Sequence, residues 1–293
     1  MDETDAIEIT ESRDALVGKL HVRRALPRRG RRTVGAWCFA DHFGPTRIVE
    51  GRGTDIGPHP HMGIQTVTWL LEGAALHRDS LGSEQLITPG QLNLMTAGSG
   101  VAHAEQVPGH HRGGLHGIQL WIAQPEATRS SAAAFEHHAQ LPRVEVQGAV
   151  VTILIGEVLG EMSLARHDRP LVGAERVLHG EATVPLERSF EHAVIVLDGS
   201  MAIDGRPLLA GRLGFLAAGR EELVLDTDGA TALLIGGEPF PEQILMWWNF
   251  VARTREEIGA AYVSWRDDDG RFGRVASMLQ RIETKPPHWQ PVP

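Results

Sequence analysis

Cysteine is almost absent from this chain of 293 residues, which contains only Cys38. One cysteine cannot form a disulfide within the chain, nor can it build a cysteine-rich zinc or iron–sulfur site. Any bound metal must therefore be held by histidine and carboxylate side chains, and the sequence contains 15 histidines. The scarcity of cysteine thus restricts the metal chemistry before any motif is considered.

Long apolar runs and a surplus of positive charge are also missing. No run reaches the roughly 20 residues of a membrane span, and the acidic N-terminus lacks the order of a signal peptide. The 28 Lys and Arg against 37 Asp and Glu give a net charge of -9, whereas phosphate binding needs excess positive charge on one face. We expect a cytosolic protein with no membrane and no nucleic acid as a direct partner.

Short apolar segments separated by Gly, Pro and Asp predict an all-β core. The clearest predicted strands cover 65–71, 92–95, 150–155, 193–197 and 231–235. Two stretches have a helical pattern: the alanine-rich Glu126–Ala139, which follows Pro125, and Arg253–Asp267, which ends before Gly270. The length and this pattern predict a β core with two accessory helices, in one large or two medium domains.

A pattern of turn glycines occurs twice in the chain. The first copy contains Gly73, Gly90 and Gly98, and the second contains Gly199, Gly211 and Gly219. In both copies the last two glycines are eight residues apart and flank an apolar segment. Glycines at such places mark turns that need a positive φ between barrel strands. The repeat predicts two jelly-roll β-barrels, each closing two sheets over a cavity.

Two pairs of potential metal ligands, His59 with His61 and His103 with Glu105, are each spaced two residues apart. Side chains two apart on a strand point to the same face, so both pairs can turn into one barrel. Three imidazoles and a carboxylate suit Fe, Ni, Co, Mn or Zn, with two coordination positions left open. An isolated His-x-His is more often a solvated or hydrogen-bonded pair, but the second pair after Gly98 favours a metal site.

The second copy of the repeat lacks these ligands. Its corresponding positions are Pro185, Glu187, Val224 and Asp226. The nearby His192 has no paired histidine and is expected to be a hydrogen-bonded core or rim residue. The second barrel is therefore predicted to be free of metal.

Several strings in the sequence resemble the pirin family, a bicupin group. They include Arg24–Pro27, Asp41–Pro45, His59–Thr68, Glu72–Gly73, His77–Ser80, Met95–Glu105, Gly117–Trp121, Gly236–Pro239 and Arg253–Ile258, in family order. The resemblance implies a bicupin, and we place a metal-binding N-terminal cupin at 1–140 and a metal-free C-terminal cupin with a C-terminal helix at 141–293. It also implies one Fe²⁺, held by His59, His61, His103 and Glu105, in agreement with the spacing of these residues.

The resemblance implies two alternative functions. Several pirins are quercetin 2,3-dioxygenases, which predicts a flavonol-like substrate, O₂ as co-substrate and Glu105 as both metal ligand and proton acceptor. An animal member is a redox-responsive transcriptional co-regulator, which predicts a protein partner. The candidate contact residues for that partner form an arginine cluster: Arg23, Arg24, Arg28, Arg29, Arg31 and Arg32. The same cluster is also typical of a solvated loop and strand edge. A third hypothesis, a cupin isomerase or sugar-processing enzyme, is supported by the fold alone, and a fold does not determine a function.

Three residues in family-typical strings are predicted to line the substrate pocket, namely His42, Gln119 and Trp121. Plain core roles for the tryptophan and the glutamine are the alternative. His110, His111 and His116 crowd the loop after Glu105 and are expected to be exposed to solvent. Trp247 and Trp248 are expected to pack the late segment onto a barrel. We expect the chain to be a monomer.

The chain departs from the common family run Arg-Gly-Phe-Glu after the second histidine of the motif. Met62, Ile64 and Gln65 stand there instead, with Gln65 at the place of the general cupin glutamate. Because Glu105 supplies a carboxylate, metal binding is expected to survive. The departures are expected to alter the pocket lining and the groups behind the ligands.

Overall fold

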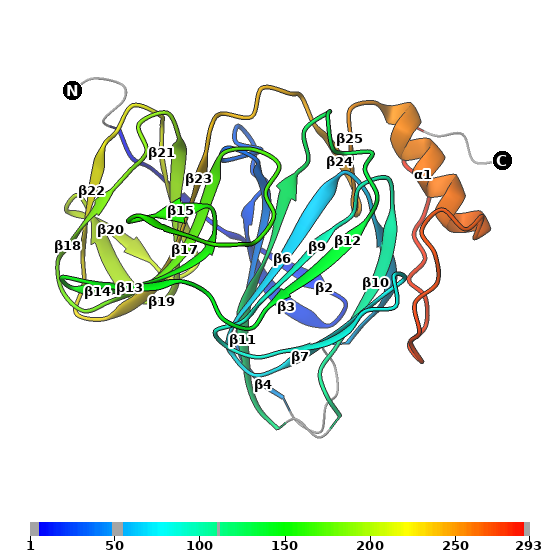
Figure 1. Cartoon of the computed structure of the whole chain (residues 1–293), viewed down its shortest axis with the longest axis horizontal. Coiled ribbons are helices and arrows are strands. Elements are labelled where there is room, and N and C mark those ends of the chain that lie inside the picture. The colour runs from blue at the N-terminus through cyan, green and yellow to red at the C-terminus, as the bar shows by residue number, and fades with distance from the viewer. Residues whose placement is uncertain (1–5, 49–54, 110–111, 290–293) are drawn as a thin grey trace.

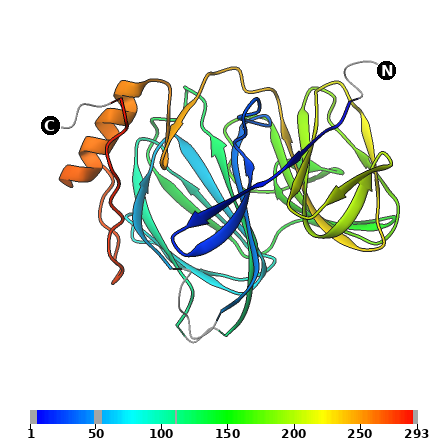
Figure 2. The same cartoon turned by 180° about the vertical axis from the view of Figure 1, so that it is seen from behind.

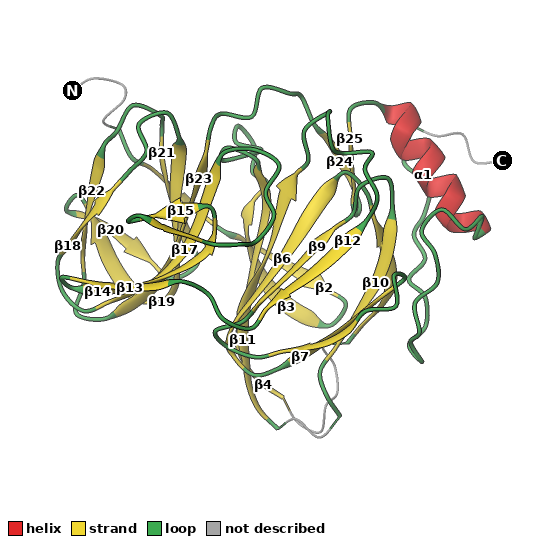
Figure 3. Cartoon of the chain, viewed as in Figure 1, coloured by secondary structure: helices red, strands yellow, loops and turns green. Residues whose placement is uncertain are grey.

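The computed structural model describes residues 6–48, 55–109 and 112–289. Two lobes built from strands lie side by side along the long axis of the molecule (Figure 1). Strands dominate both lobes, and the described residues contain one α-helix, at the edge of the first lobe (Figure 3). The expected all-β architecture is thus confirmed.

Two sheets face each other in the first lobe. The larger has the order β12-β9-β6-β11-β4-β3-β2 and the smaller the order β5-β10-β7-β8. The larger sheet consists of β2 Arg13–Val17, β3 Leu20–Leu26, β4 Trp37–Ile48, β6 Ile64–Glu72, β9 Leu92–Thr96, β11 Gly113–Ala123 and β12 Ala134–His138. The smaller consists of β5 Ile56–His61, β7 Ala75–Asp79, β8 Glu84–Ile87 and β10 Val101–Gln106.

The second lobe is built on one large, branched sheet. Its main path runs β1-β21-β19-β23-β17-β14-β13, and β18, β20 and β22 pair beside it. The bounds are β1 Glu8–Glu11, β13 Arg143–Val146, β14 Ala149–Ile155, β17 Leu171–Leu178, β18 Ala182–Pro185, β19 Glu191–Ile203, β20 Arg206–Leu209, β21 Arg212–Leu216, β22 Glu222–Asp226 and β23 Ala230–Gly237. Two small hairpins complete the strands: β15 Glu157–Val158 with β16 Glu161–Met162, and β24 Leu245–Trp247 with β25 Phe250–Ala252.

The five predicted strands are confirmed and fall within β6, β9, β14, β19 and β23. The repeated glycines also adopt the expected conformation. Gly73 has a φ of 98° and Gly199 a φ of 75°. A Cβ atom would lie 2.6 Å from the carbonyl oxygen of Gly114 in the first case and 2.4 Å from that of Gly229 in the second. Matching positions in the two lobes therefore share both the backbone conformation and the close backbone approach that require glycine.

One of the two predicted helices is wrong. After Pro125 the chain makes a turn, in which the amides of Thr128 and Arg129 both donate to the Pro125 carbonyl, and it then forms β12 instead of a helix. Pairing of β12 with β9 packs Phe135 against the first lobe, and this tertiary contact outweighs the high helix propensity of the alanines.

The second predicted helix is α1, Arg255–Asp267. Its N-terminus has a capping box, in which the Thr254 side chain accepts from the Glu257 amide and the Glu257 carboxylate accepts from the Thr254 amide. This reciprocal pair satisfies two amides that a helix start leaves unbonded. The pattern therefore located this helix to within about two residues.

Near each end of the described residues, a segment packs on the lobe formed by the other half. β1 pairs with β21 of the second lobe, and the dark-blue segment then crosses to the first lobe (Figure 2). Conversely, α1 and β25 lie on the first lobe, where the Val251 amide donates to the Met62 carbonyl. The C-terminal helix, expected as part of the C-terminal cupin, thus covers the N-terminal one.

The two lobes share an apolar core. It combines Val67 and Leu120 of the first lobe with Ile195 and Leu233 of the second. The Trp37 indole Nε1 donates to two carbonyls of the second lobe, those of Val172 and Gly236, at 3.1 Å each. Because side chains alternate along a strand, the other face of the same sheet turns toward the interior of the first lobe.

Candidate metal centre

The candidate ligands lie on neighbouring antiparallel strands, β5 and β10, where His103 is directly opposite His59. β5 is an edge strand that pairs only with β10, which explains how it accommodates Pro58 and Pro60 on either side of His59. His59 and His61 share one face because they are two residues apart. The predicted pairing on adjacent strands is therefore present.

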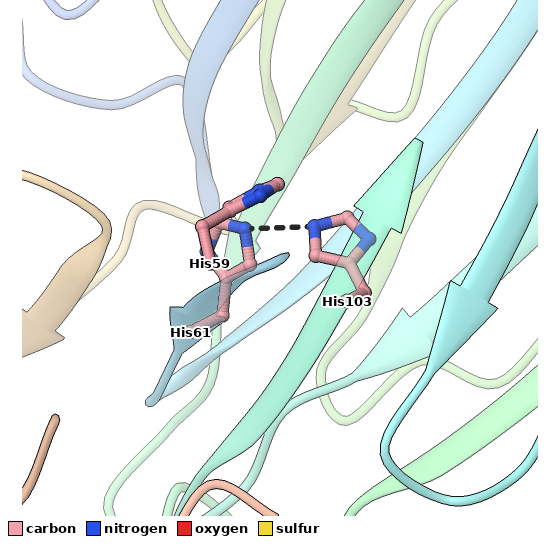
Figure 4. A group of neighbouring side chains, drawn as sticks. All are labelled: His59, His61 and His103. Carbon is pink, nitrogen blue, oxygen red and sulfur yellow. Dashed lines mark hydrogen bonds between the residues drawn. The ribbon is translucent and has the colours of Figure 1, made fainter. Parts of the chain in front are cut away.

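Three imidazoles converge at this place. One ring nitrogen from each of His59, His61 and His103 lies within 4.8 Å of the others, and all three side chains are buried. Figure 4 shows the rings facing one another, with Nε2 of His61 3.1 Å from Nε2 of His103. Within the described part of the chain, no other group of three or more His, Cys, Asp or Glu converges in this way.

Backbone carbonyls orient two of the three rings. Nδ1 of His59 is 2.9 Å from the Gly57 carbonyl oxygen, and Nδ1 of His61 is 3.2 Å from that of Asn249. A carbonyl oxygen can only accept, so each Nδ1 carries the hydrogen and each Nε2 keeps its lone pair. The lone pairs are then directed to the common centre.

Burial keeps these imidazoles neutral. It lowers the pKa of His59 to about 4 and holds the pKa values of His61 and His103 well below their usual range. Neutral imidazole is the form that binds metals, so no proton has to leave before an ion enters at neutral pH. Three preoriented neutral nitrogens fit a divalent metal of the first transition series.

Glu105 lies near the three histidines but outside their compact group. The register between β10 and β5 shifts after His103, which places Glu105 opposite Ile56. Its carboxylate lines the same cavity as the histidines, 3.5 Å from the Thr68 hydroxyl, and burial raises its pKa. The structure thus places a proton-accepting group at the site, while coordination by Glu105 stays a prediction.

A cavity of about 470 Å³ opens beside the histidines, a size typical of small-molecule sites. One wall is aromatic: Trp121 stacks on Phe39 with 4.0 Å between ring centroids, and its plane lies at 77° to that of His61. Another portion of the lining is aliphatic and includes Leu20 and Val22. The cavity therefore suits a flat, largely apolar ligand.

Several polar side chains of the cavity are hydrogen-bonded to one another. The Thr68 hydroxyl donates to Oε1 of Gln119 at 2.9 Å. Arg24 donates through two nitrogens to Asp41, at 2.7 and 2.6 Å, and its guanidinium lies over the Phe39 ring. These groups can recognise hydroxyl or carbonyl oxygens of a ligand at fixed positions.

The predicted pocket residues separate into two sets. Gln119 and Trp121 line the cavity, whereas His42 does not. His42 points to the opposite side of β4, where its Nε2 lies 2.8 Å from Nε2 of His116, and both rings are buried. The expected exposure of His116 is thus wrong, and His110 and His111 lie outside the described residues.

The departures from the family run lie away from the cavity. Ile64 belongs to an apolar cluster, Met62 packs beneath the α1 segment, and the Gln65 amide donates to Thr96 and to the Arg166 carbonyl. None of the three lines the cavity. The expected change in pocket lining is therefore absent at these positions.

Sequence reasoning missed several contributors to the site. Trp248 lines the cavity and Asn249 orients His61, both from the turn between β24 and β25. The Asn249 contact uses a backbone carbonyl 188 residues away in sequence, so no residue pattern could have indicated it. Arg24 and Asp41 belong to the strings that resemble the pirin family, and that resemblance was the signal that could have indicated them as cavity residues.

The second lobe lacks a comparable site in its described residues. His192 is buried as expected, and burial lowers its pKa to about 4. Among the described residues, no group meets the geometry of a hydrogen bond to its Nδ1, where a hydrogen-bonded side chain was expected. The arginine cluster is partly used within the chain: Arg23 donates to the Gly44 carbonyl, Arg24 pairs with Asp41, and Arg31 pairs with Glu8.

Comparisons with known proteins agree with this arrangement. The model of the Pirin family matches residues 19–122, and that of the pirin C-terminal cupin domain matches residues 177–273. A Pseudomonas aeruginosa protein named "putative quercetin 2,3-dioxygenase" is 44% identical, with 93% of this chain and 88% of that protein covered.

Solved structures show the same fold. The crystal structure of quercetin 2,3-dioxygenase from Acinetobacter baumannii superposes with a TM-score of 0.94 at 42% identity, covering 98% of this chain and 97% of that one. A bacterial pirin from Escherichia coli in complex with nickel(II) superposes with a TM-score of 0.63 at 19% identity, covering 80% and 100%. The second likeness shows the fold alone.

Two jelly-roll lobes, one with a convergent histidine triad, define a bicupin with a single candidate metal centre. The matches to the two family models and the similarity over most of the chain identify the family within this class of fold. This chain belongs to the pirin family. Across the described residues, no helix is both long and apolar enough to cross a membrane.

Proposed function

We propose that this protein is a metal-dependent dioxygenase that cleaves a flavonol such as quercetin with O₂. The observation that carries the proposal is the convergence of three neutral imidazoles at an aromatic-lined cavity of about 470 Å³. The names of the similar Pseudomonas and Acinetobacter proteins support the flavonol as substrate.

Fe²⁺ is the proposed metal, with Ni, Co, Mn and Zn as alternatives. The donor set fits such an ion because each Nε2 of His59 and His61 is left free by a hydrogen bond at Nδ1. In the proposed site Glu105 completes the ligands. When bound, the metal would supply Lewis acidity and the redox chemistry that the reaction with O₂ requires.

The chain's own residues bind the substrate and move its proton. The stacked pair of Trp121 and Phe39 offers a face for the flat ring system. Gln119 and Thr68 lie where they can hydrogen bond substrate oxygens. Glu105 accepts the proton of the substrate hydroxyl, because its carboxylate lines the same cavity as Gln119 and Thr68.

Oxygen uptake tests this function. Protein loaded anaerobically with Fe²⁺ and then mixed with quercetin and air is expected to consume O₂ while the flavonol absorbance is lost. The His103→Ala variant, prepared in the same way, serves as the control without a complete ligand set. Absence of both signals with Fe, Ni, Co and Mn would contradict the proposal.

A further inference from the structure

The third ligand candidate, His103, is oriented by side chains. Its Nδ1 lies 3.4 Å from Nδ1 of His77, and Nε2 of His77 lies 3.0 Å from Oδ2 of Asp79. All three residues are buried, and β7 carries His77 and Asp79 next to β10. A chain of carboxylate, imidazole and imidazole thus leads from Asp79 to the metal-facing ring.

The other oxygen of Asp79 fixes the direction of this chain. Oδ1 accepts from the backbone amides of Leu81 and Ser83, at 2.9 and 3.0 Å. Oδ2 therefore faces His77, and as an acceptor it places the hydrogen of His77 on Nε2. Nδ1 of His77 is then an acceptor, and it places the hydrogen of His103 on Nδ1. The lone pair of His103 is left on Nε2, which faces His61.

We propose that Asp79 and His77 are positioning residues, which set the tautomer and the ring orientation of His103 for metal binding. The inference rests on the metal site of the proposed function but not on its substrate. His59 and His61 are oriented in the same way by backbone carbonyls, and a side-chain substitution does not remove a backbone carbonyl. His103 is therefore the ligand whose orientation depends on replaceable side chains.

His77 itself is not placed as a ligand. Its two ring nitrogens face the rear nitrogen of His103 and the Asp79 carboxylate, so neither is directed to the centre. Its ring is stacked on Phe135, with 4.4 Å between centroids and 11° between planes, which restrains rotation. His77 also lies outside the converging triad. Its geometry is that of a support behind a metal ligand.

Asp79→Asn is the sharpest test because it reverses the chain of donors. The Asn oxygen must still accept from the amides of Leu81 and Ser83, so its NH₂ group faces His77. That change moves the hydrogen of His77 to Nδ1 and that of His103 to Nε2, where it blocks the lone pair. We expect the affinity for Ni²⁺, used as an air-stable probe, to fall about 10- to 100-fold.

A second readout is independent of metal. In ¹⁵N NMR spectra of the metal-free protein, His103 is expected to change from the Nδ1–H tautomer in the wild type to the Nε2–H tautomer in Asp79→Asn. Unchanged Ni²⁺ affinity together with an unchanged tautomer would overturn the inference. If the wild type binds Ni²⁺ but does not cleave quercetin, the proposed function fails while this inference stands.

Matched variants separate positioning from packing. At position 77, Asn and Leu have the same branched shape, with two groups on Cγ, but only the Asn oxygen can accept from Nδ1–H of His103. His77→Asn is therefore expected to stay within about threefold of the wild-type Ni²⁺ affinity, whereas His77→Leu loses about 10- to 100-fold. Equal losses in both variants would overturn the inference.

A control for the charge change is available on β12. Oε2 of Glu136 lies 3.1 Å from Nε2 of His138, in a histidine–carboxylate pair that belongs neither to the cavity lining nor to the triad. Glu136→Gln is expected to leave the Ni²⁺ affinity unchanged. A loss equal to that of Asp79→Asn would show a general effect of charge and overturn the positioning role.

Discussion

Trp69 donates a hydrogen bond of 2.9 Å from its indole Nε1 to Oε1 of Glu175, across the boundary between the two lobes. Trp69 is buried on β6, directly after Thr68, whose side chain faces the cavity. Burial raises the pKa of Glu175, although the bond from Trp69 opposes that rise. The second lobe thus supports, from behind, the sheet that forms one cavity wall.

Trp69→Phe should therefore weaken the fold by more than Glu175→Gln does. The first variant leaves a buried carboxyl without its donor and should cost about 1–3 kcal/mol of unfolding free energy. The second keeps an acceptor for the indole and should cost less than about 1 kcal/mol. Urea unfolding of the metal-free proteins measures both, and an equal loss would contradict the role assigned to this bond.

Removal of one ligand should empty the site and spare the fold. His103→Ala deletes the imidazole opposite His59 and leaves two histidines of the triad. Metal content after loading should fall severalfold or more, while the metal-free protein should still fold, with a loss of about 1–3 kcal/mol because the buried ring also bonds His77. Elemental analysis and thermal unfolding measure these quantities. Full metal occupancy in the variant would refute the ligand assignment.

Glu105→Gln separates proton transfer from metal binding. The three histidines should still hold metal when it is supplied in excess, but the amide cannot accept the substrate proton. We expect kcat to fall about 10²- to 10⁴-fold, the usual contribution of a general base. Steady-state oxygen uptake at saturating metal checks this. A variant with wild-type kcat would remove Glu105 from the proposed mechanism.

Trp121→Ala should act on substrate binding. It removes the ring that stacks on Phe39 and should raise KM for quercetin about 2- to 10-fold, the equivalent of one aromatic contact. Trp247→Phe is the matched control, because Trp247 contacts Tyr262 and Trp289 outside the cavity. Equal KM values in the Trp121 variant and the wild type would place the substrate elsewhere.

The sequence allowed the strands and the ligand triad to be predicted for a simple physical reason. Spacing of two along a strand fixes a shared face, so His59 and His61 had to point the same way. Spacing does not indicate which face of a strand turns inward. It therefore could not predict that Asp41 lines the cavity while its neighbour His42 lies on the outer side of β4. Family strings located both residues without distinguishing them.

Long-range contacts account for most of what could not be predicted. The alanine-rich segment after Pro125 becomes β12 because β9 is available for pairing, and no local pattern records that partner. The carbonyl of Asn249 and the aromatic ring of Trp248 reach the site through the folding of the late segment over the first lobe. A backbone carbonyl such as that of Asn249 is common to every residue type, so no sequence pattern indicates its role.

The pH dependence of stability should contain a contribution from His192 in the second lobe. Burial lowers its pKa to about 4, below the ordinary value of 6.5. Between these values the unfolded chain binds a proton that the native protein does not, so stability falls as the pH falls. His192 should contribute up to about 1.4 kcal/mol per pH unit in this range.

The comparison variant is His192→Gln, which cannot titrate. At pH 8 the imidazole is neutral in both states, so the difference in stability there reports only the change in packing. Below pH 6.5 the variant should lose stability less steeply than the wild type, and the two curves should converge or cross as the pH approaches 4. Urea unfolding of the metal-free proteins at pH 8, 6.5, 5.5 and 4.5 measures the slopes. Parallel curves over that range would show that His192 takes up its proton equally in the folded and unfolded states, against the effect of burial.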